Sequence, residues 1–217
     1  MTHAQVSNLA VRQIKKLNEK SIALILNKKK ASNSLLKQIL LNSTDKQLLD
    51  AVLNEFLLMA KNGNIQAKKI VTMVAYEKFN PNSNSRTRIL GLFKELAQKG
   101  DLVGLEGMLL AAKSKRNYDR YLALEAMGVL AGKGEGKVLP GLMSCVNDSL
   151  KQNRFLALRG LVDLSNRGNK EAIKGLIIGM KDSNPDRSNA TFAKHAVESL
   201  AKQKNKEAIK ALKELGG

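Results

Sequence analysis

The chain of 217 residues is 43% hydrophobic and 4% aromatic, a balance that is ordinary for a soluble protein with a core of aliphatic side chains. A single cysteine excludes a disulfide within the chain, and the presence of only three prolines favours helix and argues against strands of consequence. Lysine and arginine outnumber aspartate and glutamate by 37 to 19, so the formal net charge is +18, which suits attraction of a polyanion or an acidic protein surface.

The segment 1–43 is expected to form an N-terminal helical cap or a degenerate repeat. Apolar residues at helical spacing predict one helix over 4–28, which ends in the basic cluster 28–30, and a shorter helix over 35–41. The segment lacks the apolar core of a signal peptide, and its longest aliphatic run, 22–26, falls far short of the ~20 residues that span a bilayer. The sequence therefore predicts a soluble, cytoplasmic protein.

From residue 44 onwards, the sequence predicts helix pairs joined by very short turns. A capping box at Thr44 and Gln47 opens the first helix, and the second helix runs from Ile65 to about Phe79. The stretch 80–85 (NPNSNS) is the most loop-like part of the chain. One continuous domain of about five such pairs is expected, with approximate bounds 44–80, 86–117, 118–150, 154–187 and 188–217.

The turn inside each pair has a recurring chemistry. In the fourth pair, Gly168 follows the first helix, Asn169 is a good N-cap for the second, and Glu171 lies in that helix's first turn, where the macrodipole favours negative charge. Turn positions of this kind recur at steps of 37, 34, 34 and 36 residues, and each follows a large apolar residue by four positions; they are Gly63, Gly100, Gly134, Gly168 and, in weakened form, Lys204. Such self-similarity predicts a solenoid in which no unit buries its apolar faces alone.

The segments 120–124 (RYLAL) and 154–158 (RFLAL), with the divergent 86–90 (RTRIL) in register, resemble HEAT repeats. Armadillo repeats are similar but have three helices in each unit, and tetratricopeptide repeats share the 34-residue period but carry a tryptophan and proline signature that is missing here. The resemblance covers roughly residues 44–217 and implies an all-α, right-handed α-solenoid. It specifies architecture rather than function, because such repeats host many unrelated functions.

Three arginines, Arg86, Arg120 and Arg154, are spaced 34 residues apart at the starts of successive first helices. In-register guanidinium groups could line one edge and match spaced phosphates or carboxylates. The alternative is structural, with each arginine bonded to the carbonyls of a neighbouring loop or paired with an acid of the adjacent repeat.

A second in-register set, Lys99, Lys133 and Arg167, precedes the turn glycines, where a cation complements the helix dipole. The two sets are expected at opposite edges.

The loop 113–121 interleaves basic and aromatic residues. Its cations could contact phosphates while Tyr118 stacks on unpaired bases; Tyr121 matches Phe155 of the next repeat and is expected in the core. The complete set of candidate partner-binding residues is Arg86, Arg88, Lys113, Lys115, Arg116, Tyr118, Arg120 and Arg154.

No catalytic, metal or cofactor site is predicted. Alkylpurine DNA glycosylases resemble this fold class but use aromatic side chains and an acid in a cleft, and this chain has no tryptophan. HEAT-like di-iron hydroxylases need His–Glu pairs on several repeats, whereas only His3 and His195 occur here. Cys145 is expected on the apolar stripe of a second helix, as a buried free thiol.

Together these patterns predict a non-enzymatic HEAT-like scaffold or adaptor that presents an extended basic surface to an acidic protein segment along the second helices. Sequence-nonspecific binding of DNA or RNA is the alternative, with a strong dependence on salt. Attachment to an anionic membrane surface through the N-terminal helix and residues 28–30 ranks last, because that helix has polar residues within its apolar stripe.

Overall fold

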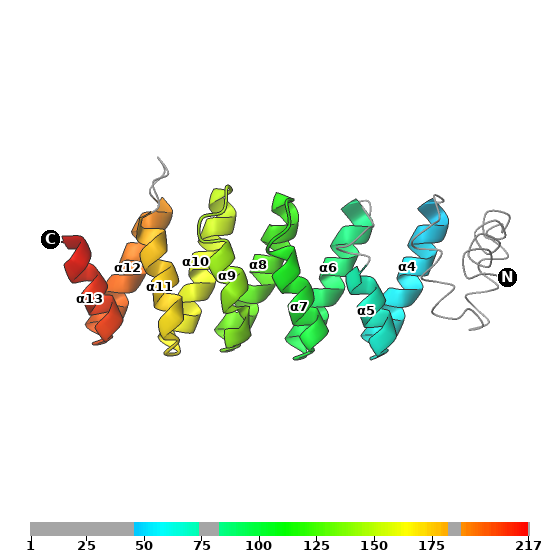
Figure 1. The fold of residues 1–217 in the computed structure, drawn as a ribbon, viewed down its shortest axis with the longest axis horizontal. Coiled ribbons are helices and arrows are strands. Elements are labelled where there is room, and N and C mark those ends of the chain that lie inside the picture. The colour runs from blue at the N-terminus through cyan, green and yellow to red at the C-terminus, as the bar shows by residue number, and fades with distance from the viewer. Residues whose placement is uncertain (1–45, 74–82, 182–187, 217) are drawn as a thin grey trace, which may run out of the picture. The chain divides into compact units, whose positions relative to one another are not determined.

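A computed structural model describes residues 46–73, 83–181 and 188–216. These residues contain helices and turns and no strand, which confirms the all-α class for this part of the chain. None of the described helices is long and apolar enough to cross a membrane. The chain divides into an N-terminal unit, 1–92, and a C-terminal unit, 93–217, and each unit is described by itself (Figure 1). The cap predicted for 1–43 lies outside the described residues.

The N-terminal unit contains α4 (Lys46–Lys61), α5 (Ile65–Met73) and the first part of α6 (Ser83–Gln98). The C-terminal unit contains the end of α6 and then alternates second and first helices of successive pairs. These are α7 (Leu102–Ala111), α8 (Asn117–Gly132), the 3-10 turn η2 (Gly136–Val138) with α9 (Leu139–Ser144), α10 (Lys151–Asn166), α11 (Lys170–Met180), α12 (Ser188–Lys202) and α13 (Lys206–Gly216).

The predicted turn chemistry is confirmed at all five positions. Gly63, Gly100, Gly134 and Gly168 have φ between 80° and 92°, and Lys204 is the one described non-glycine residue with positive φ, at 64°. Each turn residue donates its amide to the carbonyl three positions earlier, and the next residue donates to the carbonyl five positions before itself, at 2.8–3.1 Å. The latter carbonyls belong to the large apolar residues Met59, Leu96, Leu130, Leu164 and Leu200, so each first helix ends in a Schellman motif.

The residue after each turn position starts the second helix. Asn64, Asp101, Glu135, Asn169 and Asn205 each accept a backbone amide of that helix's first turn through a side-chain oxygen, at 2.9–3.1 Å. One residue therefore closes the Schellman motif of the first helix and caps the second helix. This sharing explains how two antiparallel helices can be joined by so few residues.

Lys204 occupies a conformation that glycine adopts without the steric cost of a Cβ atom. We expect Lys204→Gly to raise the free energy of unfolding by about 1 kcal/mol. Conversely, Gly168→Ala should lower it by about 1 kcal/mol through backbone strain alone, since a Cβ atom at Gly168 would meet nothing within 4 Å. Chemical denaturation followed by circular dichroism tests both changes, and a destabilised Lys204→Gly variant would contradict this explanation.

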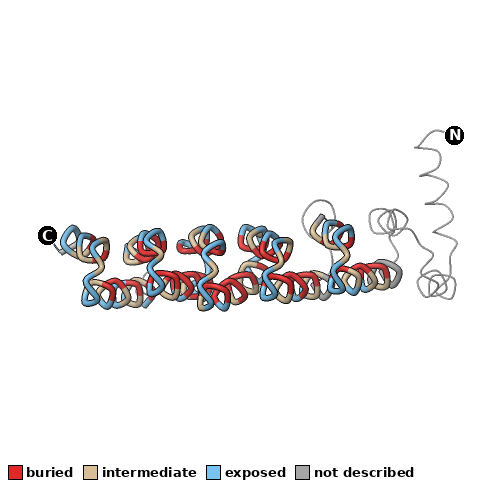
Figure 2. Tube along the Cα trace, turned by 90° about the horizontal axis from the view of Figure 1, so that it is seen from below, coloured by how far each residue is buried: buried red, intermediate tan, exposed pale blue. Residues whose placement is uncertain are grey.

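The helices of the C-terminal unit form two layers (Figure 2). The first helices α8, α10 and α12 contact one another in sequence, as do the second helices α7, α9, α11 and α13, and each first helix also packs on its second helix. Aliphatic side chains dominate the core between them, where Leu124, Leu142, Leu158, Leu161 and Ile173 are at most 1% exposed. The core therefore runs through the unit as a continuous layer rather than as separate clusters.

Glycines at 34-residue steps bring each second helix close to its first helix. Gly107, Gly141 and Gly175 lie opposite Phe93, Met127 and Leu161, and a Cβ atom on each glycine would lie 2.4–2.6 Å from those side chains. Because such distances are far inside van der Waals contact, a larger residue at any of these positions would force the facing side chain to shift. This arrangement was not evident from the sequence.

Two local predictions are wrong. Residues 83–85 were assigned to a loop but form the first turn of α6, because serine and asparagine favour helix N-termini as much as loops. Cys145 was placed within a helix, but α9 ends at Ser144 and Cys145 is its C-cap. The second helix of this pair begins as a 3-10 turn, and Ser144 Oγ donates to the Gly141 carbonyl at 2.8 Å near its end. The α-helical part is consequently only six residues long.

Candidate functional site

Arg120 is the centre of a polar network at the loop edge of the C-terminal unit. Its guanidinium forms a fork with Asp148, with Nε to Oδ2 at 2.5 Å and Nη2 to Oδ1 at 2.9 Å. It also donates to the Ser114 carbonyl at 2.8 Å and to Asn117 Oδ1 at 2.7 Å. The Arg120 and Asp148 side chains are only 13% and 2% exposed. This network joins the loop before α8 to the loop before α10.

The carboxyl group of Asp148 stays ionised within this network. Burial would raise its pKa, but hydrogen bonds from Arg120, from the Leu150 amide and from Asn153, together with the Arg120 charge, hold that pKa below its ordinary value. The same bond to Asp148 raises the pKa of Arg120. The pair is therefore fully charged near neutral pH and is satisfied internally.

Arg154 is also committed to the protein interior. It is 4% exposed, and its Nη1 donates to the carbonyls of Asp148 and Ser149 at 2.8 and 3.3 Å. Its neighbour Asn153 donates to the Asn117 carbonyl at 3.3 Å, and Asn189 donates in the same way to the Lys151 carbonyl at 3.1 Å. The sequence left two roles open for the arginines, ligand binding and structural bonding to loops or acids. The hydrogen bonds of Arg120 and Arg154 match the structural role.

Arg86 and Arg88 lie on the part of α6 that belongs to the N-terminal unit, and both are half-buried. Arg120 and Arg154 belong to the other unit. The structural role is therefore supported for two members of the predicted set of three arginines, Arg120 and Arg154.

The remaining candidates lie on the surface of the loop before α8 and the start of that helix. Lys113, Lys115 and Arg116 are exposed, and Tyr118 is 58% exposed. The Tyr118 ring stacks on Tyr121, with centroids 6.1 Å apart and planes inclined by 10°. Tyr121, which was expected in the core, is half-buried on the outer side of α8, and its hydroxyl donates to Glu125 at 3.2 Å.

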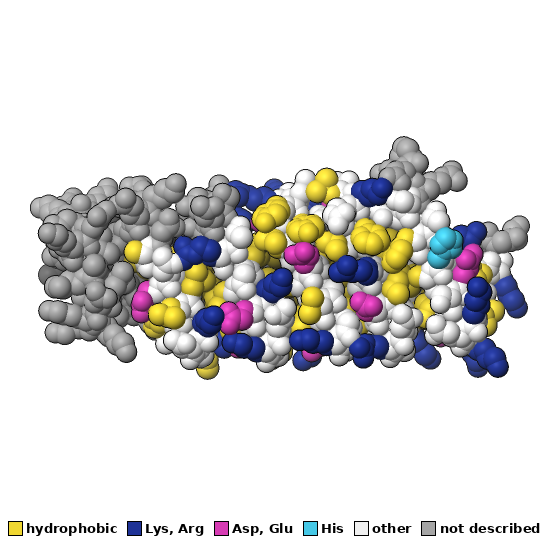
Figure 3. Space-filling view, turned by 180° about the vertical axis from the view of Figure 1, so that it is seen from behind, with side chains coloured by type: hydrophobic (Ala, Val, Ile, Leu, Met, Phe, Trp, Pro, Cys, Tyr) yellow, Lys and Arg dark blue, Asp and Glu magenta, His cyan; other side chains and the backbone are white. Residues whose placement is uncertain are grey.

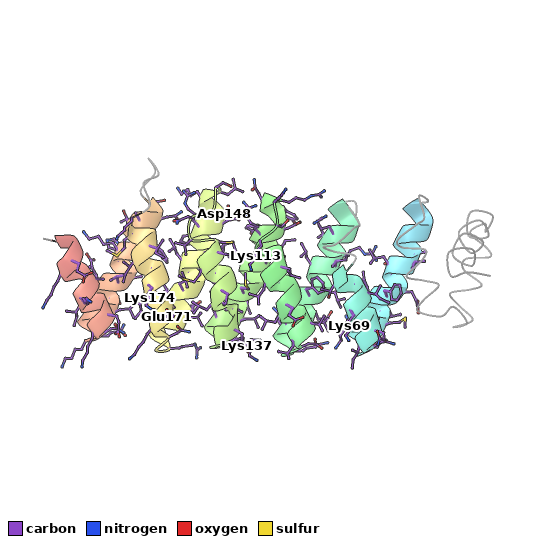
Figure 4. All side chains as sticks on the ribbon, viewed as in Figure 1. Lys69, Lys113, Lys137, Asp148, Glu171 and Lys174 are labelled. Carbon is purple, nitrogen blue, oxygen red and sulfur yellow. The ribbon has the colours of Figure 1, made fainter. Side chains whose placement is uncertain are left out.

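The opposite edge of the C-terminal unit carries the intra-pair turns. Figure 4 shows Asp148 near one edge and Lys137 near the other. At the turn edge, Arg167 Nη2 donates to the Gly132 carbonyl, the last residue of the preceding first helix, while Lys99 bonds Glu95 at 3.0 Å. These contacts give Arg167 and Lys99 partners within the protein.

The second helices of the C-terminal unit present a surface that includes only Lys113 among the candidate residues. Leu110 on α7 and Ile178 on α11 are 41% and 40% exposed, and the exposed Ser144 is their equivalent on α9. The preceding residues Leu109, Met143 and Ile177, which are equivalent to one another, are half-buried beside them. Exposed lysines lie on both sides of this apolar row: Lys113 and Lys181 toward the loops, and Lys137, Lys174 and Lys210 toward the turns. We call these residues the second-helix face.

This face has an excess of positive charge. The segments 102–113, 136–147, 170–181 and 206–214 contain eight lysines and four glutamates and no other charged residue. One of the glutamates, Glu171, is neutralised locally by Lys174 at 2.7 Å (Figure 4). The sequence pattern contained the lysines, but only the packing of the helices shows which apolar residues remain exposed between them.

Cys145 is a buried thiol whose Sγ donates to the Ala112 carbonyl at 3.3 Å, and burial raises its pKa. A thiol in this setting is a poor nucleophile because the thiolate is disfavoured. Across residues 46–73, 83–181 and 188–216, no cluster of three or more His, Cys, Asp or Glu side chains could hold a metal ion.

These features describe an all-α protein of consecutive helix pairs that share one turn chemistry. No family model matches the sequence, and no curated protein matches it. Among solved structures, the crystal structure of an engineered protein, a target of the Northeast Structural Genomics Consortium, aligns over 84% of this chain and 84% of that chain, with 19% identity and a TM-score of 0.48. Function is therefore inferred from the surface of the chain itself.

Proposed function

We propose that this chain is a non-enzymatic adaptor that binds an acidic segment of another protein along the second-helix face. The proposal includes a HEAT-like, right-handed α-solenoid of about five repeats as the architecture. The observation that carries it is the exposed apolar row at Leu110 and Ile178 with lysines on both sides. Apolar side chains supply affinity when buried, and the surrounding lysines select an acidic partner.

The spacing of the helices constrains the shape of this partner. Packed helices lie about 8–10 Å apart, and an extended chain advances about 3.3 Å per residue. Every third residue of an extended segment that crosses α7, α9 and α11 would therefore meet a new helix. A segment with leucine at every third position and acidic residues between them fits both the apolar row and the lysines.

Binding of nucleic acid is the second candidate, and the exposed Tyr118 ring supports it. Tyr118 lies beside the exposed cations Lys115 and Arg116, so one base could stack on the ring while its phosphates contact those cations. The buried Arg120 and Arg154 would contribute little to such contacts, because their donors already bond Asp148 and loop carbonyls.

Fluorescence anisotropy with a labelled acidic, leucine-containing peptide and with labelled single- and double-stranded DNA and RNA separates the two candidates. We expect the peptide to remain bound between about 50 and 200 mM salt, since apolar contacts contribute to its affinity, whereas nonspecific nucleic-acid binding should weaken steeply over that range. Lys115→Ala with Tyr118→Ala should leave peptide binding unchanged. Tight RNA or DNA binding that survives at the higher salt and is lost in this double variant would favour the second candidate instead.

A further inference from the structure

The outer side of the first helices differs from the second-helix face in both polarity and charge. Figure 3 shows apolar side chains gathered over this side, with single acidic and basic side chains among them. Phe155 on α10 and Phe192 on α12 form a ring contact with centroids 5.1 Å apart, and both are only half-buried. Tyr121 on α8 is half-buried, and Val129 on the same helix is 42% exposed. We call this surface the first-helix face.

Positive charge is not in excess over the middle of the first-helix face. Away from the helix ends, its charged residues on α8, α10 and α12 are two cations and three acids: Arg159, Lys194, Glu125, Asp163 and Glu198. A chain with a formal charge of +18 repels another copy of itself over most of its surface. Over the middle of the first-helix face that repulsion is smaller than on the second-helix face, and apolar groups are also available there.

The repeat spacing gives this face two pairs of residues that are complementary across a two-fold axis. Glu125 and Arg159 occupy equivalent positions 34 residues apart on α8 and α10, as do Tyr121 and Phe155. A two-fold axis between these adjacent helices would place Glu125 of each copy opposite Arg159 of the other, and Tyr121 opposite Phe155. A two-fold interface uses the same patch on both copies, so each favourable pair would form twice.

We propose that the first-helix face binds a second copy of this chain to form a two-fold symmetric dimer. The second copy is favoured over an unrelated partner by the in-register opposition of Glu125 with Arg159 and by the local charge balance. Such a dimer would leave the second-helix face of each copy open, and two linked faces would increase the avidity for a partner that carries two acidic segments. This inference does not depend on whether the second-helix face binds an acidic protein segment.

A charge-swap experiment tests this interface directly. Sedimentation equilibrium of the full chain should show a monomer–dimer equilibrium, which is measured at low and at higher salt because the net charge opposes association. Glu125→Arg and Arg159→Glu should each raise the dimer dissociation constant at least about tenfold, because each places like charges opposite each other twice. The double variant should restore dimerisation, and Lys174→Glu on the other face should leave it no weaker.

Two outcomes would overturn the proposal: a purely monomeric chain at every concentration and salt tested, or a double variant that dimerises no better than the single variants. Arg159 is exposed and Glu125 is half-buried, so neither replacement should prevent folding, and thermal melts of the variants check this. Peptide binding by the second-helix face is measured separately, so the failure of one proposal is distinguishable from the failure of the other.

Discussion

Gly104→Ala should destabilise the C-terminal unit by about 3 kcal/mol, the largest effect expected for the replacement of a glycine among the described residues. A Cβ atom at Gly104 would lie 2.3 Å from the backbone nitrogen of Ala97 and 2.7 Å from the Phe93 carbonyl oxygen. Backbone atoms cannot rotate away as side chains can, so α7 would have to move off α6. Urea denaturation followed by circular dichroism measures the change.

Gly128→Ala is the matched control. Gly128 is also buried within a helix, but a Cβ atom there would have only Arg159 Nη2 nearby, at 3.8 Å. Since alanine is a better helix former than glycine, this change should raise the free energy of unfolding by up to about 1 kcal/mol. If both replacements changed the free energy of unfolding equally, the close approach of α6 and α7 would not be the reason for glycine at position 104.

Asp148→Ala should destabilise the unit by about 3 kcal/mol, because it leaves the largely buried Arg120 guanidinium without its charged partner and the Leu150 amide without its acceptor. Exposed ion pairs in the same unit provide the comparison. In the ion pair of Lys174 with Glu171, both side chains are more than 60% exposed. Glu171→Ala should therefore change the free energy of unfolding by less than about 1 kcal/mol.

The same pair predicts an acid sensitivity. The pKa of Asp148 is lower in the folded state than in the unfolded state, so its contribution to stability is fully present above the unfolded value near pH 4 and is lost as the pH falls through the folded value. Asp148→Asn should be less stable than the original chain at pH 7, and the difference should shrink below about pH 4. A difference that stays constant down to the acid range would contradict an ionised Asp148.

The turns could be predicted from sequence because their chemistry is local. A left-handed glycine, an apolar residue four positions earlier and a capping side chain one position later are all read within a few residues, as Leu164, Gly168 and Asn169 show. Helix starts were less certain, since the serines and asparagines at 83–85 suit a loop as well as a first turn.

Features that depend on contacts between helices could not be predicted from the local sequence. The fit of Gly107 against Phe93 requires knowing that these positions face each other. The sequence left two roles open for the arginines, and only the position of Asp148, 28 residues after Arg120, separates them. Likewise, the lysines of the second-helix face were visible in the sequence, but the exposure of Leu110 and Ile178 between them was not.

The most direct test of the proposed adaptor function compares peptide binding by variants of the two faces. Isothermal titration of an acidic, leucine-containing peptide is carried out on the original chain, on Lys113→Glu with Ile178→Ser, and on the control Val129→Ser with Lys194→Glu. We expect the second-helix variant to bind at least about tenfold more weakly, and the control to match the original chain. Equal loss in both variants, or no loss in the second-helix variant, would contradict an acidic partner on the second-helix face.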